Sequence, residues 1–331
     1  MINTFTKKRI IFFALFSVAI FACNQKVEKK QITETDIVAG IYIAPDTSLI
    51  PKNEFGELVK YGRELIINTA YYIGPEGKNG KYLGNKMNCQ NCHLDAGTKP
   101  YGINFFSTHG RYPQYRAREN RVLNIAERIN NCVERPHSGK PLPLDSKEIL
   151  AISCYIKWLG ENVPVGGHVE GDKLMEIDLL ERAADSKKGE TVYIQKCALC
   201  HGKDGEGKMK ANNICYEYPP LWGTQSYQAG SSMHRVTKAA KFIYANMPNG
   251  ANYKKPTLTI EEAFDVAAFI NNDSLHKRPQ PVYFDYPNKE SKPIDYGKGP
   301  YLDSFPEAQH KYGPYQLIIN FYKAKGLKVN L

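Results

Sequence analysis

The chain has 331 residues, of which 42% are hydrophobic and 24% are charged, and its formal net charge at pH 7 is +10. This is the composition of an ordinary globular protein, which argues against a disordered chain, and the length is sufficient for two modest domains and their connections. A basic surface would suit nucleic acid, but the chain carries no nucleic-acid-binding motif. We therefore expect small anions, anionic partners or lipid head groups.

The first residues predict export from the cytoplasm. Three positive charges at 7–9 precede an apolar run over 10–22, which is short for a membrane span and ends beside Cys23. The stretch resembles a bacterial lipoprotein signal peptide (1–22) with the lipobox "IFAC", which would anchor the mature protein to a membrane through a lipid on Cys23. Ordinary secretion and an uncleaved anchor are the alternatives. We expect a periplasmic location, and loss of the three basic residues would lower the charge from +10 to +7.

The segment 23–50 is polar, and we interpret it as a tether. After it, the same order of elements occurs twice along the chain. The helical pattern "ELVKYGRELIINTAYYIG" precedes "NCQNCHLDAGT", and "ADSKKGETVYIQK" precedes "CALCHGKDGEG". Each half then closes with an amphipathic helix, one capped by Asp145 or Ser146 and the other beginning at Thr257 or Thr259. No segment is rich in predicted strands, so the fold class is all-α.

The repeated CxxCH motif has the spacing of c-type haem attachment, in which two thiols bond the porphyrin and the histidine binds the iron. The attachment residues are Cys89, Cys92, His93, Cys197, Cys200 and His201. A zinc site made of two CxxC pairs is the alternative, but more than a hundred residues separate the pairs, and each carries the extra histidine. The sequence therefore predicts two covalently attached haem c groups.

These motifs divide the chain into two cytochrome c-like domains in tandem. We expect the first domain over 51–164, a linker over 165–185 that is rich in glycine, and the second domain over 186–277. The remaining residues, 278–331, are rich in Pro, Tyr and Gly and show little periodicity. We expect them to form an irregular extension that packs over the domains through its aromatic side chains.

The sixth ligand of a small cytochrome c commonly comes from a methionine shortly before the last helix. In the second domain Met247 holds this position, whereas Met209 lies only eight residues after His201 and has little chain with which to pass around the ring. Met247 is the predicted iron ligand, with Met233 as the alternative.

No methionine lies between Met87 and Met175, and Cys132 holds the position in the first domain that corresponds to Met247. Cys132 is therefore the predicted ligand of the first iron. Two histidines, His109 and His137, are alternatives, and Cys132 could instead form a disulfide with Cys154 or Cys215; a disulfide between those last two is a further alternative.

Basic residues precede Cys132 in "YRARENRVLNIAERINNC", which has no Pro or Gly and is predicted to be one helix over 115–132. At about 100° per residue, Arg118, Arg121 and Arg128 would lie within roughly 40° of the direction of Cys132. A solvated basic surface is the simpler interpretation, but acidic partners are few. Guanidinium groups suit doubly charged oxyanions, so this face favours an anion-binding site.

At this point the chain resembles the dihaem thiosulfate dehydrogenases, some of which act as tetrathionate reductases. The resemblance rests on "GRYPQYRARENRV", "ERINNCVERPHSGKPLP", "CALCHGKDGEG", "YPPLWGTQSYQAGSSM", "FIYANMP" and the tail "QHKYGP". It implies that Cys132 is the sixth ligand of the active-site haem, that Arg118 and Arg128 bind sulfur oxyanions, and that Met247 ligates the electron-transfer haem. It also implies that two thiosulfates are joined to tetrathionate.

The implied electron path runs from the His/Cys haem to the His/Met haem and on to an external partner such as another cytochrome. The chain departs from the family pattern at two places: Asn246 stands where some relatives have an alternative lysine ligand, and Pro136 where many have serine. A dihaem electron carrier without its own substrate and, less favoured, a dihaem peroxidase are the alternative functions. The carrier has no use for a cysteine ligand beside an arginine face, and the resemblance to a peroxidase does not extend beyond CxxCH.

Overall fold

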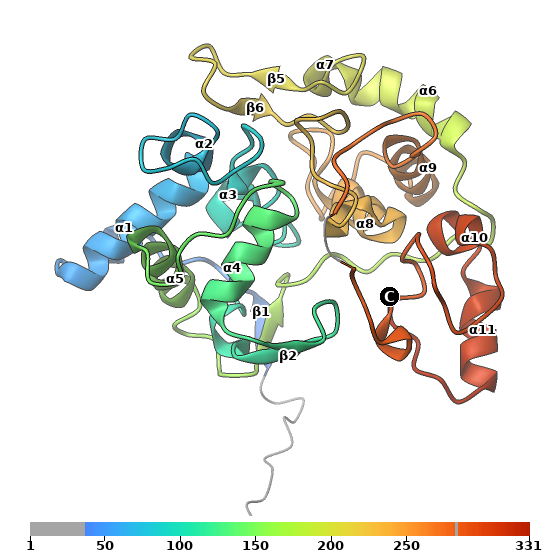
Figure 1. Ribbon diagram of the computed structural model, residues 1–331, viewed down its shortest axis with the longest axis horizontal. Coiled ribbons are helices and arrows are strands. Elements are labelled where there is room, and N and C mark those ends of the chain that lie inside the picture. Colours follow the sequence, from blue (N-terminus) through green and yellow to red (C-terminus); the bar gives the residue numbers. More distant parts are fainter. Residues whose placement is uncertain (1–36, 282–283) are drawn as a thin grey trace, which may run out of the picture. The chain divides into compact units, whose positions relative to one another are not determined.

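The computed structural model describes residues 37–281 and 284–331 (Figure 1). The predicted signal peptide, Cys23 and the first part of the predicted tether lie outside these ranges. Among the residues that are described, no helix is both long enough and apolar enough to cross a bilayer.

The first cytochrome c domain is built on two packed helices, α1 (Glu54–Ile67) and α5 (Lys147–Leu159). Their N-termini are capped by Asn53 and Ser146, whose side chains accept backbone N–H groups of the first turn. The helices cross closely at Gly62, where an added Cβ would lie 2.1 Å from the carbonyl oxygen of Ala151. The shorter helices of this domain are α2 (Thr69–Ile73), α3 (Leu94–Gly97) and α4 (Ile125–Glu134).

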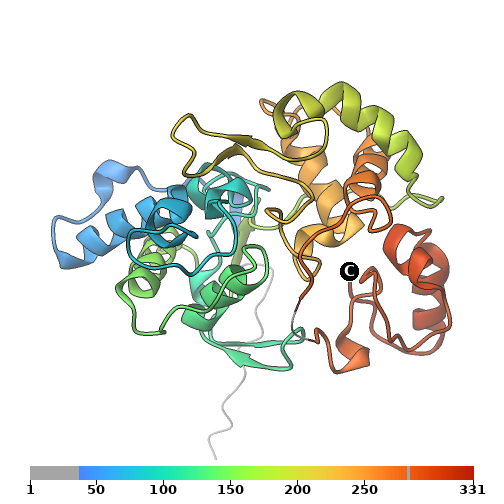
Figure 2. The same cartoon turned by 45° about the horizontal axis from the view of Figure 1, so that its top comes forward.

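The second domain repeats this crossing with α6 (Ser186–Lys196) and α9 (Ile260–Ile270). A Cβ at Gly189 of α6 would lie 1.9 Å from the Asp265 carbonyl oxygen of α9. Thr259 caps α9 with a full capping box, which decides between the two starts that the sequence allowed. The domain also contains α7 (Ala198–His201) and α8 (Val236–Asn246). Both helix pairs can be followed in Figure 1 and Figure 2, and the mainly helical fold that the sequence predicts is confirmed.

Three short two-stranded sheets accompany the helices in the described part of the chain. The strand β1 (Ile37–Ile41) pairs in parallel with β4 (His168–Glu170), and β5 (Lys208–Met209) pairs antiparallel with β6 (Tyr216–Tyr218). The first pairing joins the predicted tether to the predicted linker. From residue 37 onward the segment 23–50 is therefore part of the folded body, and the tether prediction is wrong for that part.

The single helix predicted over 115–132 is also wrong. Its first half is a hairpin of β2 (Gln114–Arg116) and β3 (Arg121–Leu123), and only the second half belongs to α4. The turn between the strands ends at Asn120, whose φ of 53° is left-handed. Asn124 then caps α4, and its side chain forms a reciprocal capping box with Glu127.

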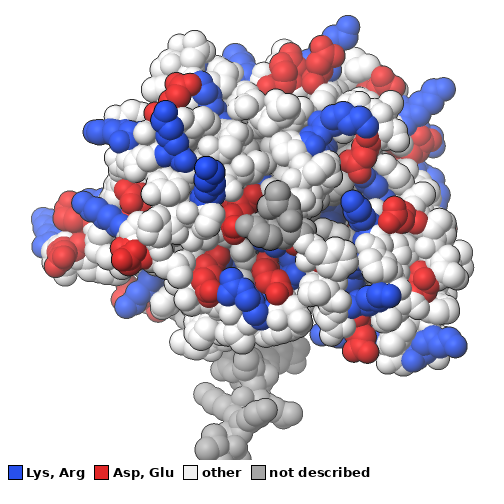
Figure 3. All heavy atoms as spheres, viewed as in Figure 1, with Lys and Arg blue, Asp and Glu red and all other residues white. Residues whose placement is uncertain are grey.

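The C-terminal extension is not irregular throughout, because it contains α10 (Glu307–Tyr312) and α11 (Gln316–Ala324). Buried side chains of α11, including Ile318 and Tyr322, belong to the hydrophobic core of the second domain. Five 3₁₀ turns complete the described elements: η2 (Thr47–Leu49), η3 (Cys89–Asn91), η4 (His109–Arg111), η5 (Ser232–His234) and η6 (Lys289–Ser291). On the face seen in Figure 3, basic and acidic side chains are interspersed.

Candidate functional site

The second CxxCH motif borders a largely apolar cavity of about 290 Å³. Cys197, Cys200 and His201 line it, together with two methionines, Met233 of η5 and Met247 at the end of α8. The remaining candidate, Met209, packs near the cluster of Met87, Tyr216 and Tyr227 and does not line the cavity. Met247 therefore stays the predicted sixth ligand, with Met233 as the alternative.

Both motif histidines are oriented as iron ligands require. The Nδ1 atom of His201 lies 2.8 Å from the Pro219 carbonyl oxygen, and Nδ1 of His93 lies 2.5 Å from the Ile103 carbonyl oxygen. A backbone carbonyl is a common partner for the second nitrogen of a metal-bound histidine, because it fixes the tautomer and leaves Nε2 for the metal. Burial lowers the pKa of His201, which favours the neutral ring. The residues present therefore fit haem c at each motif.

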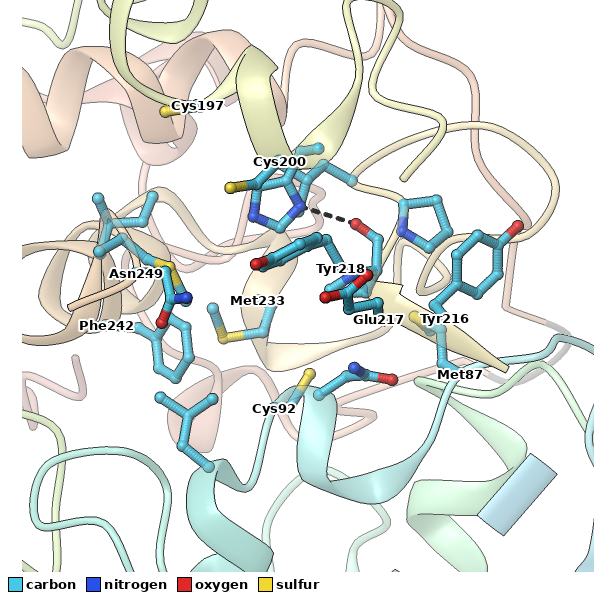
Figure 4. A pocket seen from close by; sticks show the side chains of 18 of the residues that line it. Met87, Cys92, Cys197, Cys200, Tyr216, Glu217, Tyr218, Met233, Phe242 and Asn249 are labelled. Atoms are coloured by element: carbon cyan, nitrogen blue, oxygen red, sulfur yellow. Dashed lines mark hydrogen bonds between the residues drawn. The ribbon is translucent and has the colours of Figure 1, made fainter. Parts of the chain in front are cut away.

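The cavity also reaches the first motif. Its lining includes Cys92 together with Gln90 and Asn91 of the same motif. Figure 4 shows Cys92 and Met233 facing the same space from different parts of the chain. The two candidate haem sites therefore adjoin within the described body of the protein.

Cys132 lies on α4 beside the first motif. The Nη1 atom of Arg128 donates a hydrogen bond of 3.0 Å to its Sγ. Burial alone would raise the pKa of this thiol. The charge of Arg128 and a hydrogen bond with His93 outweigh burial and lower the pKa to about 6. Burial instead raises the pKa of Cys89 and of Cys92 to about 12. Cys132 is thus the thiol of this group that the surroundings favour as a thiolate.

The alternative ligands of the first iron have other environments. His137 is buried, its Nδ1 lies 3.1 Å from Oδ1 of Asn85, and burial lowers its pKa to about 4. Its Nε2 lies 3.8 Å from Sγ of Cys89, so this ring is near the first motif. His109 lies in η4, next to Gly110, whose carbonyl accepts the N–H of Gly166 in the linker.

Two of the three arginines expected near Cys132 are brought together, by a different arrangement from the predicted helix face. Arg118 lies in the turn between β2 and β3, and the next residue, Glu119, accepts a 3.0 Å hydrogen bond from Asn131, the neighbour of Cys132 on α4. The side chain of Arg118 is only 10% exposed. Arg121, in contrast, is exposed and forms a 2.5 Å ion pair with Glu127.

Sequence reasoning missed the acidic partners of this cluster. Asp285 of the extension lies 3.7 Å from Nε of Arg118 and 2.8 Å from Nη2 of Arg135. Glu119 lies 3.3 Å from Nη1 of Arg135. The cluster is therefore a set of buried arginines that two carboxylates partly neutralise. No periodic pattern could have linked Asp285 to the others, because it lies far away along the chain.

The remaining cysteines form no disulfide in the part of the chain that is described. All seven of its cysteines are free, so the pairings of Cys132, Cys154 and Cys215 that the sequence left open are absent. Cys215 is buried and Cys154 is half-buried on α5. In the same ranges no group of three or more His, Cys, Asp or Glu side chains is arranged to hold a metal ion.

Comparison with known families agrees with two cytochrome domains. Residues 78–165 match the family described as SoxA/TsdA, cytochrome c domain, and residues 186–274 match the family described as cytochrome c.

Among curated proteins, the thiosulfate dehydrogenase of Stutzerimonas stutzeri (strain A1501) is 36% identical over 236 residues, which are 71% of this chain and 72% of the relative. The thiosulfate dehydrogenase of Allochromatium vinosum is 36% identical over 239 residues, or 71% of this chain and 83% of that protein. Among solved structures, the thiosulfate dehydrogenase TsdBA from Marichromatium purpuratum superposes with a TM-score of 0.68 at 32% identity, over 80% of this chain. This chain spans 55% of the solved chain.

Proposed function

Because the chain belongs to the thiosulfate dehydrogenase family of c-type cytochromes, we propose that it is a dihaem enzyme that joins two thiosulfates into one tetrathionate. In this reaction two S₂O₃²⁻ ions form one sulfur–sulfur bond and become S₄O₆²⁻, and two electrons leave for an external acceptor such as another cytochrome. The reverse reaction, tetrathionate reduction, uses the same site.

On this proposal, one haem is held by Cys89, Cys92 and His93 with Cys132 as sixth ligand. The second is held by Cys197, Cys200, His201 and Met247. When bound, the haems would accept the two electrons and pass them on, the thiolate-ligated iron having the lower potential and the methionine-ligated iron the higher. The shared cavity that contains Cys92 and the second motif supports a short path between them.

The contact between Arg128 and Cys132 is the observation that carries the proposal. Two thiosulfate dianions repel each other strongly in a site from which water is excluded, so cations must offset the repulsion before their sulfur atoms can bond. Arg128 supplies such a charge directly beside the sulfur of Cys132, and Arg118 supplies a second one. The hypothesis includes a bond between this sulfur and a sulfur of the substrate.

We also propose that the protein acts in the periplasm as a lipoprotein anchored through Cys23. This rests on the signal-like first residues of the sequence. Labelling with a fatty acid should be lost in a Cys23→Ala variant.

The assay for the activity is purified holoprotein with thiosulfate and ferricyanide as acceptor. We expect tetrathionate to form, with two ferricyanides reduced for each tetrathionate. Cys132→Ser should lose the low-spin thiolate signature and most of the turnover, whereas Cys154→Ser, at a half-buried cysteine on α5, should keep both. Absence of tetrathionate with both haems loaded would favour the electron carrier, and full turnover in Cys132→Ser would remove the role of this sulfur.

The ligand of the second iron has its own test. Met247→Leu should lower the potential of one haem by removing a thioether ligand, whereas Met233→Leu should leave both potentials unchanged. A lowered potential in Met233→Leu alone would assign the ligand to that residue.

A further inference from the structure

A buried carboxylate of the C-terminal extension lies against the arginine cluster. The side chain of Asp285 is only 2% exposed. Its Oδ1 accepts a 2.8 Å hydrogen bond from Arg135, and its Oδ2 accepts one of 3.1 Å from the Tyr296 hydroxyl and lies 3.7 Å from Nε of Arg118. A carboxylate this deeply buried is retained only where charge and hydrogen bonds offset its loss of hydration.

The position of Arg118 is set mostly by residues outside its own domain. Its Nη1 donates a 2.7 Å hydrogen bond to the carbonyl of Gly230, which belongs to the second domain. Its guanidinium lies over the ring of Tyr286 at 5.6 Å, and its backbone carbonyl accepts the N–H of the same residue. Together with Asp285, these contacts fix an arginine of the first domain from two other parts of the chain.

Arg118 lies against α4, the helix that carries Arg128 and Cys132. Asp285 lies 3.7 Å from Arg118 and 2.8 Å from Arg135 at the end of α4, and Glu119, next to Arg118, accepts a 3.0 Å hydrogen bond from Asn131, next to Cys132. Guanidinium groups gathered in this way repel one another. A long side chain that is repelled by its neighbour turns toward solvent unless an anion holds it. Asp285 is such an anion. Its carboxylate attracts the guanidinium of Arg118 at 3.7 Å, and it accepts its closer hydrogen bond from Arg135. The carboxylate can therefore hold the guanidinium of Arg118 in place and still leave N–H groups of this guanidinium available to a substrate.

We infer that Asp285 is a positioning residue for the anion site: it holds Arg118 beside Arg128 so that both guanidinium groups face the same substrate. The inference rests on the proposed function, because it requires that Arg118 binds thiosulfate. It makes the C-terminal extension part of the active site rather than only a cover for the second domain.

The test compares Asp285→Asn with wild-type holoprotein in the ferricyanide assay. We expect KM for thiosulfate to rise about tenfold, the size of effect that follows loss of one charge-assisted contact. KM for ferricyanide should not change. Stabilisation by thiosulfate, measured as the increase in Tm on adding it, should shrink in the variant; this readout does not depend on turnover.

Two further variants keep the test sharp. Asp303→Asn is the matched control, because Asp303 is a buried carboxylate of the same extension that pairs with His310. Tyr296→Phe removes a single hydrogen bond to Asp285 but keeps the carboxylate, so it should raise KM by less than Asp285→Asn does, about threefold, and it is informative even if Asp285→Asn does not fold.

The outcomes separate the two hypotheses. If wild-type protein neither forms tetrathionate nor is stabilised by thiosulfate, the proposed function fails, and the inference fails with it. If wild-type protein does both, but Asp285→Asn behaves like Asp303→Asn, only the positioning role is overturned. A fall in KM for Asp285→Asn would also overturn it, because the carboxylate would then be a competitor of the substrate for Arg118.

Discussion

At the scale of single residues, the proposed chemistry depends on the arrangement of Arg128 and Cys132. They stand one helical turn apart on α4, which brings the guanidinium to 3.0 Å from the sulfur. The same guanidinium is then available both to stabilise a thiolate and to bind a dianion. The fork of arginine suits the second task better than the single ammonium group of lysine.

Arg128→Lys should therefore keep the charge and lose the paired hydrogen bonds. We expect kcat/KM for thiosulfate to fall about 10- to 100-fold, as for other contacts that orient an active-site group. Arg121→Lys is the control, because Arg121 is exposed and pairs with Glu127 on the surface. Steady-state kinetics with ferricyanide measure both variants, and equal values for the two would contradict the assignment.

His276 predicts a dependence of stability on pH. It is buried, its ring stacks on Trp222 at 3.9 Å, and its Nε2 has no hydrogen-bond partner among the described residues. Burial lowers its pKa to about 4, whereas the pKa of an unfolded histidine is about 6.5. The unfolded chain therefore binds this proton at higher pH than the folded chain does, and protonation favours unfolding.

The free energy of unfolding should thus fall by about 1 to 2 kcal/mol between pH 7 and pH 5, with no contribution from this group above pH 7.5. Denaturant titrations at several pH values measure the effect. In His276→Phe the fall should be smaller, and an equal fall in both proteins would exclude His276 as its cause.

At the scale of elements, the same close helix crossing supports both domains. In each, a glycine of the first helix meets a backbone carbonyl of the last helix, at Gly62 and at Gly189. The crossing fixes the helix that leads into each CxxCH motif against the helix that closes the domain. A side chain at either glycine would push these helices apart.

Gly62→Ala should accordingly destabilise the protein by about 2 kcal/mol, despite the better helix propensity of alanine. Lys60→Ala, on the exposed side of the same helix, should change stability by less than about 0.5 kcal/mol. Denaturant unfolding followed by circular dichroism compares them. Similar stability in the two variants would mean that the helices can separate at little cost.

The sequence predicted the long helices of this fold well, and its main error at this scale has a clear origin. The apolar faces and caps of α1, α5, α6 and α9 are local features that periodicity reveals. In 115–132 the absence of Pro and Gly favoured one helix, but Asn120 can adopt a left-handed turn, and "NIAE" at 124–127 is itself a helix start. These two local signals were present in the sequence and were outweighed by the general composition.

At the scale of the whole molecule, the two domains and the extension share buried contacts. Gln228 donates a 2.6 Å hydrogen bond to the Glu134 carbonyl, Asn85 donates one of 3.5 Å to the Ser226 carbonyl, and Asp285 pairs with Arg135. The described residues accordingly form one compact unit. Contacts between distant segments of this kind cannot be predicted from periodicity, so the contacts of Asp285 could not be predicted. Cys132 and the CxxCH residues could be identified as candidates because their spacing and position are local features of the sequence.

We therefore expect the holoprotein to unfold in one cooperative transition. Calorimetry should show a single peak, and the absorbance of the two haems should change at the same temperature. Asp303→Asn should lower this temperature without splitting the peak. Two separate transitions, one for each haem, would show that the domains are stable independently.

The support of Arg118 by Gly230 and Asp285 bears on the order in which the protein becomes active. Both residues follow the first domain in the chain, so they emerge later during synthesis. A chain that has received its first haem but has not yet folded its extension would already be a redox protein, yet its first domain would lack the support for Arg118. On the proposed function, maturation of the cofactor and acquisition of substrate binding would then be separate events, and the last part of the chain would control the second.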